Sequence, residues 1–368
     1  MGGLPIREAD YQANSSLVEA MPLPENDQGL PPGDMAQASQ LWSKAIGGQP
    51  VVLARSIDQA RQALLAAAEI PSGATVALPA NATRSLVEAV KRHGARPYFV
   101  NLNADLAMHV DAPDVALTWG QPVAGLPQRV SASTRSIWLD YTDTLPSSDL
   151  SVDVGLYNLH LSANPAESGA LLVFQDAALA EKVKAQLEPL NQPDPTAVLA
   201  QYRRFETLAR AQKTALAESW RGLFEAAGLP LFSLRSRGAL AHGVAVQIPS
   251  EIDIATYYAY VKAENTPVQW LPMVRPLHYA AATSCQSTAA HLARWMLVPI
   301  GPNYSTEEIA HAILGVVKAA DYLGVRWIID PAWAAEYAAM MDDWYGPDHD
   351  AYRPIFGIVD VKQSHAYA

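Results

Sequence analysis

Short apolar runs of strand length alternate with longer helical stretches between residues 51 and 187, and this alternation constrains the fold more than any other feature of the chain. VVLA begins at Val51 and TVALP begins at Thr75, and the residues between them, about 58–70, carry apolar side chains at helical spacing. The order of strand, helix and strand then repeats along the chain. Strands that alternate with helices form a mostly parallel sheet covered by helices. The sequence therefore predicts an α/β layer over this region.

The second half of the chain has a different pattern. A long helical stretch runs from Pro195 to Ala227 and ends at a Gly-Leu-Pro stop. Shorter strands and helices follow, among them a predicted strand VQWLPM at Val268 and a helix that begins near Ser305, and they predict a smaller α+β domain. We therefore predict an irregular N-terminal arm over residues 1–37, a large domain over 38–200, a small C-terminal domain over 201–325 and an aromatic and acidic tail over 326–368.

The composition argues against several classes of function. Of the 368 residues, 50% are hydrophobic and 17% are charged, which is typical of a globular protein. The formal net charge is −11 and the sequence has no basic stripe, so we expect no nucleic-acid partner. The sequence has neither a long apolar run nor a signal-peptide pattern. We therefore expect a cytoplasmic protein without a membrane span.

Cys285 is the single cysteine of the chain. An internal disulfide and a thiolate metal cluster are therefore excluded, and we expect no metal site. A lone cysteine can act as a nucleophile, but in a stretch rich in Ser, Thr and Ala it is more often a packed side chain.

The stretch SGATVALPANATRSLVEAVKRHGARPYFVNLN, from Ser72 to Asn103, resembles a recurring pattern of the DegT–StrS family of sugar aminotransferases. That pattern is a G-D-x-V-x-V-P strand and a helix, closed by G-A-x-P-x-F-V-D. The matching residues, which fall in register without a gap, are Gly73, Val76, Pro79, Gly94, Ala95, Pro97, Phe99 and Val100.

Three further segments match the same family in order and spacing. IWLDYTD at Ile137 is similar to the strand that ends in the cofactor aspartate, and ESGALLVFQDAALAEKVKAQ at Glu167 is similar to the strand and helix that follow the active-site lysine. HLARWMLVPIGPNYSTEEIAHAILGVVKAA, which begins at His291, resembles the closing segment of the family. The resemblance covers about residues 38–325. It implies a fold-type-I aminotransferase-like α/β fold, with a large domain built on a mostly parallel seven-stranded sheet between helices, a smaller C-terminal α+β domain, and a dimer.

The family binds pyridoxal phosphate (PLP), and several of the implied contacts are altered here. The turn that grips the phosphate is Ser-Gly-Thr in the family and Ser56-Ile57-Asp58 in this chain, which adds a bulky side chain and a negative charge. The position of the aromatic ring that stacks on the pyridine falls within Asn81 to Thr83, none of which is aromatic. The aspartate that pairs with the pyridine nitrogen is present as Asp140.

The lysine that links covalently to PLP is missing at the aligned position, which is Leu161. No lysine lies between Lys91 and Lys182. Transamination needs an amine that forms an imine with the cofactor and then moves the proton, and leucine cannot do this. From these losses we expect no cofactor. The degenerate cofactor positions are Ser56, Asp58, Thr83, Asp140 and Leu161.

Three hypotheses follow. The protein is a scaffold or regulatory partner, as a homodimer or as a heterodimer with an active paralogue; or its cleft binds a small molecule or performs PLP-independent acid–base chemistry; or PLP or its pyridoxamine form (PMP) binds noncovalently, with His160 in place of the lysine. The candidate acid–base residues are Asp140, Asp143, His160 and Glu167. The candidate pocket residues are Tyr141, Asn158, Ser162, Arg275, His278 and Tyr279.

Overall fold

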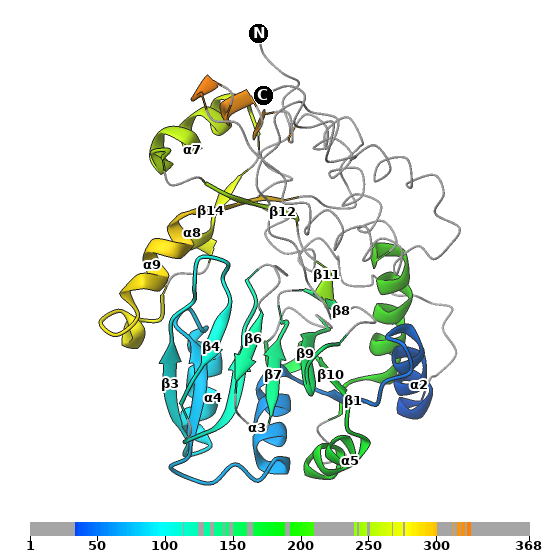
Figure 1. Ribbon diagram of the computed structural model, residues 1–368. Coiled ribbons are helices and arrows are strands. Elements are labelled where there is room, and N and C mark those ends of the chain that lie inside the picture. Colours follow the sequence, from blue (N-terminus) through cyan, green and yellow to red (C-terminus); the bar gives the residue numbers. More distant parts are fainter. Residues whose placement is uncertain are drawn as a thin grey trace, which may run out of the picture.

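The structure is a computed structural model (Figure 1). It describes residues 34–112, 114–123, 129–132, 136–142, 144–146, 150–159, 165–187, 192–209, 239–240, 243–248, 251–266, 268–274, 277–299 and, within 312–324, residues 312, 315–316, 318–320 and 322–324.

A seven-stranded sheet is the centre of the fold. Its strands, in chain order, are β1 (Val51–Ala54), β2 (Thr75–Pro79), β3 (Arg96–Val100), β5 (Val115–Gly120), β7 (Ile137–Asp140), β9 (Val154–Asn158) and β10 (Ala170–Phe174). They lie in the order β1-β10-β9-β7-β5-β2-β3. The pairs from β9 through β7, β5 and β2 to β3 are parallel, and β10 is antiparallel to both of its neighbours. The predicted mostly parallel sheet is confirmed.

Helices cover both faces of this sheet (Figure 1). The helices are α2 (Met35–Ala45), α3 (Ile57–Ala67), α4 (Arg84–Arg92), α5 (Ala177–Gln186) and a helical segment over residues 195–209. Side chains of α3, α4 and α5 form one apolar cluster with the sheet, and side chains of α2 and of 195–209 form another. Apart from the edge strand β3, the strands are largely buried, which explains why they are nearly continuous apolar runs in the sequence.

The start of α3 shows how the sequence sets a helix boundary. Ser56 is the N-cap, and its hydroxyl accepts a hydrogen bond from the backbone N–H of Gln59 at 3.2 Å. Asp58 lies in the first turn, where a negative charge is favourable. The helix then buries Ala60, Arg61, Leu64 and other residues against the sheet.

Gly94 explains one glycine of the family pattern. It ends the turn after α4 with a φ of +87°, a conformation that other residues rarely adopt. A Cβ at this position would lie 2.8 Å from Oγ of Ser72, so the close approach also favours glycine. The turn returns the chain to β3, which runs parallel to β2.

A second, three-stranded antiparallel sheet lies in the C-terminal half. Its order is β12 (Gly243–Gln247), β14 (Trp295–Pro299), β13 (Gln269–Trp270), and it is accompanied by α7 (Ile254–Ala263), α8 (Leu271–Val274) and α9 (Gln286–Ala293). The predicted strand at Val268 is wrong in its second part, because the ladder stops at Trp270 and a helical turn follows. Pro272 accounts for this, since proline cannot donate to a strand ladder but fits the first turn of a helix.

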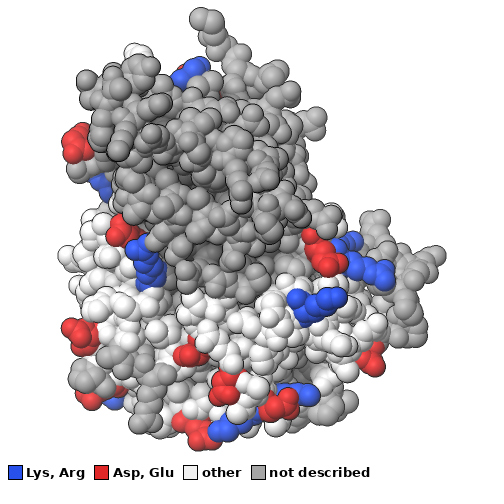
Figure 2. Space-filling view, turned by 45° about the vertical axis from the view of Figure 1, so that its right-hand side comes forward, with Lys and Arg blue, Asp and Glu red and all other residues white. Residues whose placement is uncertain are grey.

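The remaining elements are small. They are β4 (Met108–Val110) paired with β6 (Val130–Ala132), β8 (Leu145–Pro146) paired with β11 (Ala239–Leu240), and the 3-10 turns η1 (Pro165–Glu167) and η3 (Tyr279–Ala281). Among the described helices, none combines the length and the apolar character that crossing a membrane requires. On the face shown in Figure 2, basic and acidic side chains are interspersed over the described surface and do not form a basic stripe.

Candidate functional site

Asp140 ends β7 at the carboxyl edge of the parallel strands, where open α/β sheets place their ligand sites. Alternation along the strand directs Trp138 into the cluster with α3, whereas Leu139 and Tyr141 pack into the cluster on the opposite face. Asp140 is on the same side as Trp138, and its carboxylate faces α3. This local geometry places a buried carboxylate between a strand end and a helix.

The carboxylate of Asp140 is paired with the guanidinium of Arg61 from α3. Nε and Nη2 of Arg61 both donate to Oδ2 of Asp140, at 3.0 and 2.6 Å. Oδ1 accepts a hydrogen bond from the backbone N–H of Thr142 at 3.2 Å. The side chains of Arg61 and Asp140 are 3% and 0% exposed, so this ion pair is buried.

A chain of hydrogen bonds extends from this ion pair to the start of α4. Nη1 of Arg61 donates to Oγ of Ser85 at 3.1 Å, and Oγ of Ser85 lies 3.2 Å from Oγ1 of Thr83. Gln121, which follows β5, accepts from the backbone N–H of Thr83 at 2.7 Å and donates to its hydroxyl at 3.1 Å. We call Arg61, Asp140, Ser85, Thr83 and Gln121 the polar network. It connects α3, α4, β5 and β7 at one edge of the sheet.

Glu167 does not join Asp140. It lies just before β10 and forms an ion pair with Arg55, which follows β1. Their side chains are 48% and 40% exposed. Two strand spacings separate β7 from β10, or about 10 Å. The two carboxylates therefore belong to separate ion pairs and do not form an acid–base pair in this structure.

Glu167→Gln is expected to change stability little. The ion pair with Arg55 is exposed to water, and such pairs contribute about 0–1 kcal/mol. A urea titration followed by circular dichroism measures the difference from the wild-type protein. A loss of several kcal/mol would contradict the assignment of this pair to the solvated surface.

The degenerate phosphate turn also differs from its expected arrangement. We expected Asp58 to repel a phosphate group, but its carboxylate forms an ion pair with Arg92 at the end of α4, and both side chains are about half exposed. Ser56 caps α3 as described above. Asp58 therefore has a local cation as its partner, and its charge is directed to the outer surface of α3 and α4.

Tyr141 and Asn158 were predicted to line the cleft. Tyr141 is 2% exposed and stacks on Tyr157 with 5.1 Å between ring centroids, within the apolar cluster opposite α3. Burial raises the pKa of Tyr157 well above its usual range, and the nearby Tyr141 adds to this shift. Asn158 ends β9 and is half-buried. The ring of Tyr141 thus packs in the core on the side of the sheet away from Arg61.

His278 and Tyr279 lie near the ends of β2 and β3, on the far side of the sheet from β9 and β10. The backbone N–H of His278 donates to the carbonyl of Ala80 at 2.8 Å, and its ring stacks on Phe99 of β3 with centroids 5.0 Å apart. His278 is 5% exposed, whereas Tyr279 is 70% exposed. Three strand spacings separate β3 from β7, or about 14 Å. These residues are therefore not brought to the carboxylate of Asp140.

Lowering the pH is expected to destabilise the protein through His278. Burial lowers the pKa of His278 below its ordinary value of 6.5, and the cations of Lys91 and Arg84 lower it further against an opposing effect of Glu88. Below about pH 6.5 the unfolded chain binds a proton that the folded His278 does not yet bind, so stability falls as the pH drops toward the folded pKa. Urea titrations at pH 7.5 and 5.5 measure this loss. In His278→Gln the loss should be smaller than in the wild-type protein, and an equal loss would assign the pH dependence to other groups.

Five predicted site residues lie outside the described residues: Asp143, His160, Leu161, Ser162 and Arg275. Cys285 is described, is 1% exposed, and belongs to an apolar cluster with Ala80 and Ala281. Arg61, Ser85 and Gln121 were not predicted as site residues from the sequence. For Arg61 a signal was present, because it occupies an apolar-face position of α3 next to Ala60 and Leu64, where an arginine needs an acidic partner.

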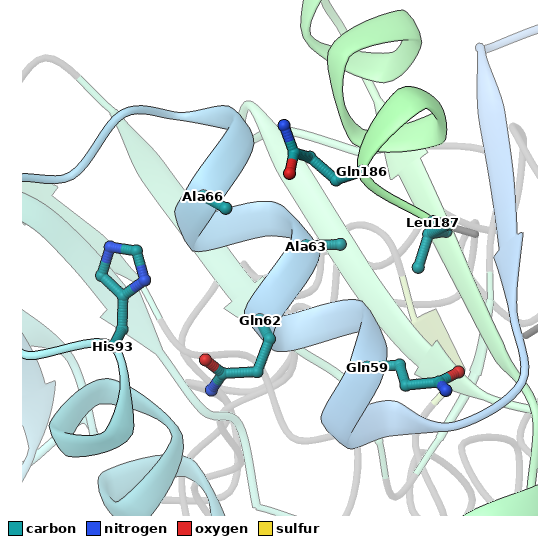
Figure 3. Close-up of a pocket in the computed structure, with 7 residues that line it drawn as sticks. All are labelled: Gln59, Gln62, Ala63, Ala66, His93, Gln186 and Leu187. Carbon is teal, nitrogen blue, oxygen red and sulfur yellow. The ribbon is translucent and has the colours of Figure 1, made fainter.

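A pocket of about 320 Å3 lies on the outer side of α3 (Figure 3). Its lining residues are Gln59, Gln62, Ala63, Ala66, His93, Gln186 and Leu187. Figure 3 shows them on α3, at the end of α4 and at the end of α5. None is a site residue predicted from the sequence. The His93 ring is already hydrogen-bonded to the carbonyl of Ile70 at 2.8 Å. The pocket is therefore lined by amide, alanine, leucine and histidine side chains, and none of its lining residues is acidic.

Comparison with known proteins gives matches at the level of structure. No protein-family model matches the sequence, and no curated protein matches it. A protein of Streptococcus pneumoniae assigned as a sugar aminotransferase, Spr1654, in its PLP form, superposes with a TM-score of 0.59 at 14% identity and covers 78% of this chain and 91% of its own. A DegT DnrJ EryC1 StrS aminotransferase from Brucella abortus gives 0.57 at 16% identity, covering 84% and 95%. A GDP-4-keto-6-deoxymannose-3-dehydratase with a trapped PLP-glutamate geminal diamine gives 0.58 at 11% identity, covering 86% and 99%.

These neighbours correct the expectation that no cofactor is involved. Solved structures of this fold include the PLP and PMP forms of the streptococcal protein and a protein of Bacillus subtilis with bound PMP. The expectation of a fold without PLP was wrong, because it treated altered single positions as loss of the whole site.

The described residues of this chain nevertheless do not offer PLP the contact expected of Asp140. A protonated pyridine nitrogen would donate to this carboxylate, but Oδ2 already accepts two hydrogen bonds from Arg61 and the side chain is fully buried. The structural comparison and the sheet topology together show that the chain has the fold of the fold-type-I aminotransferases.

Proposed function

We propose that this chain is an aminotransferase-fold protein of sugar or specialised-metabolite biosynthesis that has lost lysine-dependent transamination and acts as a scaffold or regulatory partner. The observation that carries the proposal is the buried ion pair between Arg61 and Asp140, which engages the carboxylate expected to hold the cofactor ring. The absence of any lysine between Lys91 and Lys182 supports it. The sugar-processing neighbours supply the class of pathway.

The chain lacks, at the aligned position, the lysine amine that transamination requires. Transamination by PLP proceeds through a lysine that is joined to the cofactor and then moves protons between carbon atoms. Leu161 at the aligned position has no atom that binds or releases a proton. The nearest lysines in the sequence are in α4 and α5, where Lys91 and Lys182 form exposed ion pairs with Glu88 and Glu69. They are therefore surface residues of the two helices.

Reductive labelling tests this proposal directly. The protein is incubated with PLP, treated with borohydride, digested and analysed by mass spectrometry for pyridoxyl groups on its eight lysines. We expect only scattered, substoichiometric labelling that matches the labelling of the urea-unfolded chain. Stoichiometric labelling of one lysine in the folded protein, lost on unfolding, would overturn the proposal.

A second candidate function is that of an enzyme that holds PLP or PMP noncovalently, with His160 in the part of the lysine. It is favoured by the dehydratase among the neighbours. One structure of that enzyme contains a trapped PLP-glutamate geminal diamine, and another is of a variant in which a histidine is replaced by asparagine. Desalting after incubation with PLP or PMP separates the two candidates. Retained cofactor absorbance that disappears in His160→Asn supports the second, and retention unchanged in His160→Asn counts against it.

A partner role also requires an assembly. The resemblance implies a dimer, so we expect about twice the chain mass of 39.7 kDa by light scattering, or a mixed dimer with a lysine-bearing paralogue. A monomer that remains a monomer beside such a paralogue would exclude the partner role.

A further inference from the structure

We propose that Arg61 is an internal competitor of the cofactor ring, whose guanidinium binds the Asp140 carboxylate and keeps a pyridinium N–H from reaching it. This inference rests on the proposed function and deepens it, because it names the side chain that limits the affinity of the protein for PLP. It concerns the pyridine end of the cofactor, whereas the proposed function concerns the missing lysine.

The carboxylate of Asp140 already accepts hydrogen bonds from other parts of the protein. Each carboxylate oxygen has about two lone pairs. Oδ2 of Asp140 accepts two hydrogen bonds from Arg61, and Oδ1 accepts one from Thr142. Because the side chain is 0% exposed, the remaining lone pair of Oδ1 faces protein atoms. A ligand that binds Oδ2 must therefore displace Arg61, and one that binds Oδ1 must displace the protein atoms that cover it.

The pyridinium of the cofactor and the guanidinium of Arg61 differ in how strongly they can bind Asp140. A pyridinium supplies one charge-assisted hydrogen bond and is charged only while its nitrogen is protonated. Arg61 supplies two bonds to the same oxygen, and a guanidinium stays charged at any ordinary pH. It is also part of the chain, so it pays no entropic cost of association. The internal cation therefore wins the competition for Asp140.

Arg61 is also held in place by a hydrogen bond that does not involve Asp140. Nη1 donates to Ser85, and Ser85 is linked through Thr83 to Gln121 in the polar network. Moving the guanidinium away would break this third bond and leave a buried charge without a partner, which is costly. The geometry thus stabilises the blocked arrangement instead of one in which Arg61 swings aside.

The experiment measures PLP affinity by absorbance and fluorescence titration. It compares the wild-type protein with Arg61→Gln, Asp140→Asn and the double variant, and each variant is checked for folding by circular dichroism. Arg92→Gln is the matched control, because Arg92 also pairs with an aspartate but on the surface. We expect Arg61→Gln to bind PLP about 10- to 100-fold more tightly, which is the gain that a charge-assisted hydrogen bond supplies. We expect the double variant to lose this gain and Arg92→Gln to match the wild-type protein.

If Arg61→Gln does not fold, the inference is tested by comparing Asp140→Asn with the wild-type protein. In the wild-type background, Asp140→Asn should leave the PLP affinity within about twofold, because the ring does not contact Asp140. PLP labelled with 15N in the ring should then show the chemical shift of the free cofactor at the same pH. A tenfold loss of affinity in Asp140→Asn, or a folded Arg61→Gln without any gain, would overturn the inference. Stoichiometric lysine labelling would overturn the proposed function alone.

Discussion

Arg61→Leu is expected to lower the free energy of unfolding by about 3–5 kcal/mol, because it leaves the buried carboxylate of Asp140 without its cation. Urea titration followed by circular dichroism and tryptophan fluorescence measures this loss. The same change at Arg92, whose pair with Asp58 is half exposed, should cost only about 0–1 kcal/mol.

The double variant Arg61→Leu/Asp140→Leu separates the two contributions to this effect. Replacing a whole buried ion pair by apolar side chains is often neutral or stabilising, so the double variant should be more stable than Arg61→Leu. If it is equally unstable or less stable, the effect of Arg61 is one of packing and hydrogen bonding to Ser85, and the charge of Asp140 is not its cause.

The second large effect is expected for Trp138→Ala, which should lower the free energy of unfolding by about 3–5 kcal/mol. Trp138 is 1% exposed and meets Trp119 of β5 edge to face, with ring centroids 5.1 Å apart. Its indole N–H donates to Oγ of Ser136 at 2.9 Å. The substitution therefore leaves a large cavity in the apolar cluster beneath Asp140 and removes a hydrogen bond.

Chemical denaturation of Trp138→Ala measures this effect, with Tyr98→Ala as the control. Tyr98 is also an aromatic residue of the central sheet, but it lies on the edge strand β3 and is 47% exposed. We expect its replacement to cost much less. Comparable losses in the two variants would show that the contribution of Trp138 to the free energy of unfolding does not come from its burial in this cluster.

The fold could be predicted largely from the sequence because its strands and helices have distinct apolar periods. The strand over β7 and the aspartate at its end are examples, since IWLD is a buried run that stops at a polar residue. The predicted strand at Val268 is wrong only beyond Trp270, because Pro272 cannot donate to the strand ladder and a helical turn begins at Leu271.

The site could be predicted less well, because it depends on strand order and on which face of a helix turns inward. Asp140 and Glu167 are predicted to line one cleft because both align with segments that flank the cofactor site of the resembled family. The antiparallel strand β10, however, lies between β9 and β1, and this places Glu167 beside Arg55. Arg61 was not among the predicted site residues, although its inward position on α3 requires an acidic partner.

The polar network has a consequence for how the protein opens. It ties two helices to two strands, so each of these four elements can leave the sheet edge only by breaking at least one bond of the polar network. Such linked groups tend to open together as a single cooperative unit. Backbone amides in α3, α4, β5 and β7 should therefore exchange with deuterium at one common opening free energy, and the amides of α5, which contribute nothing to the network, should be free to exchange at another.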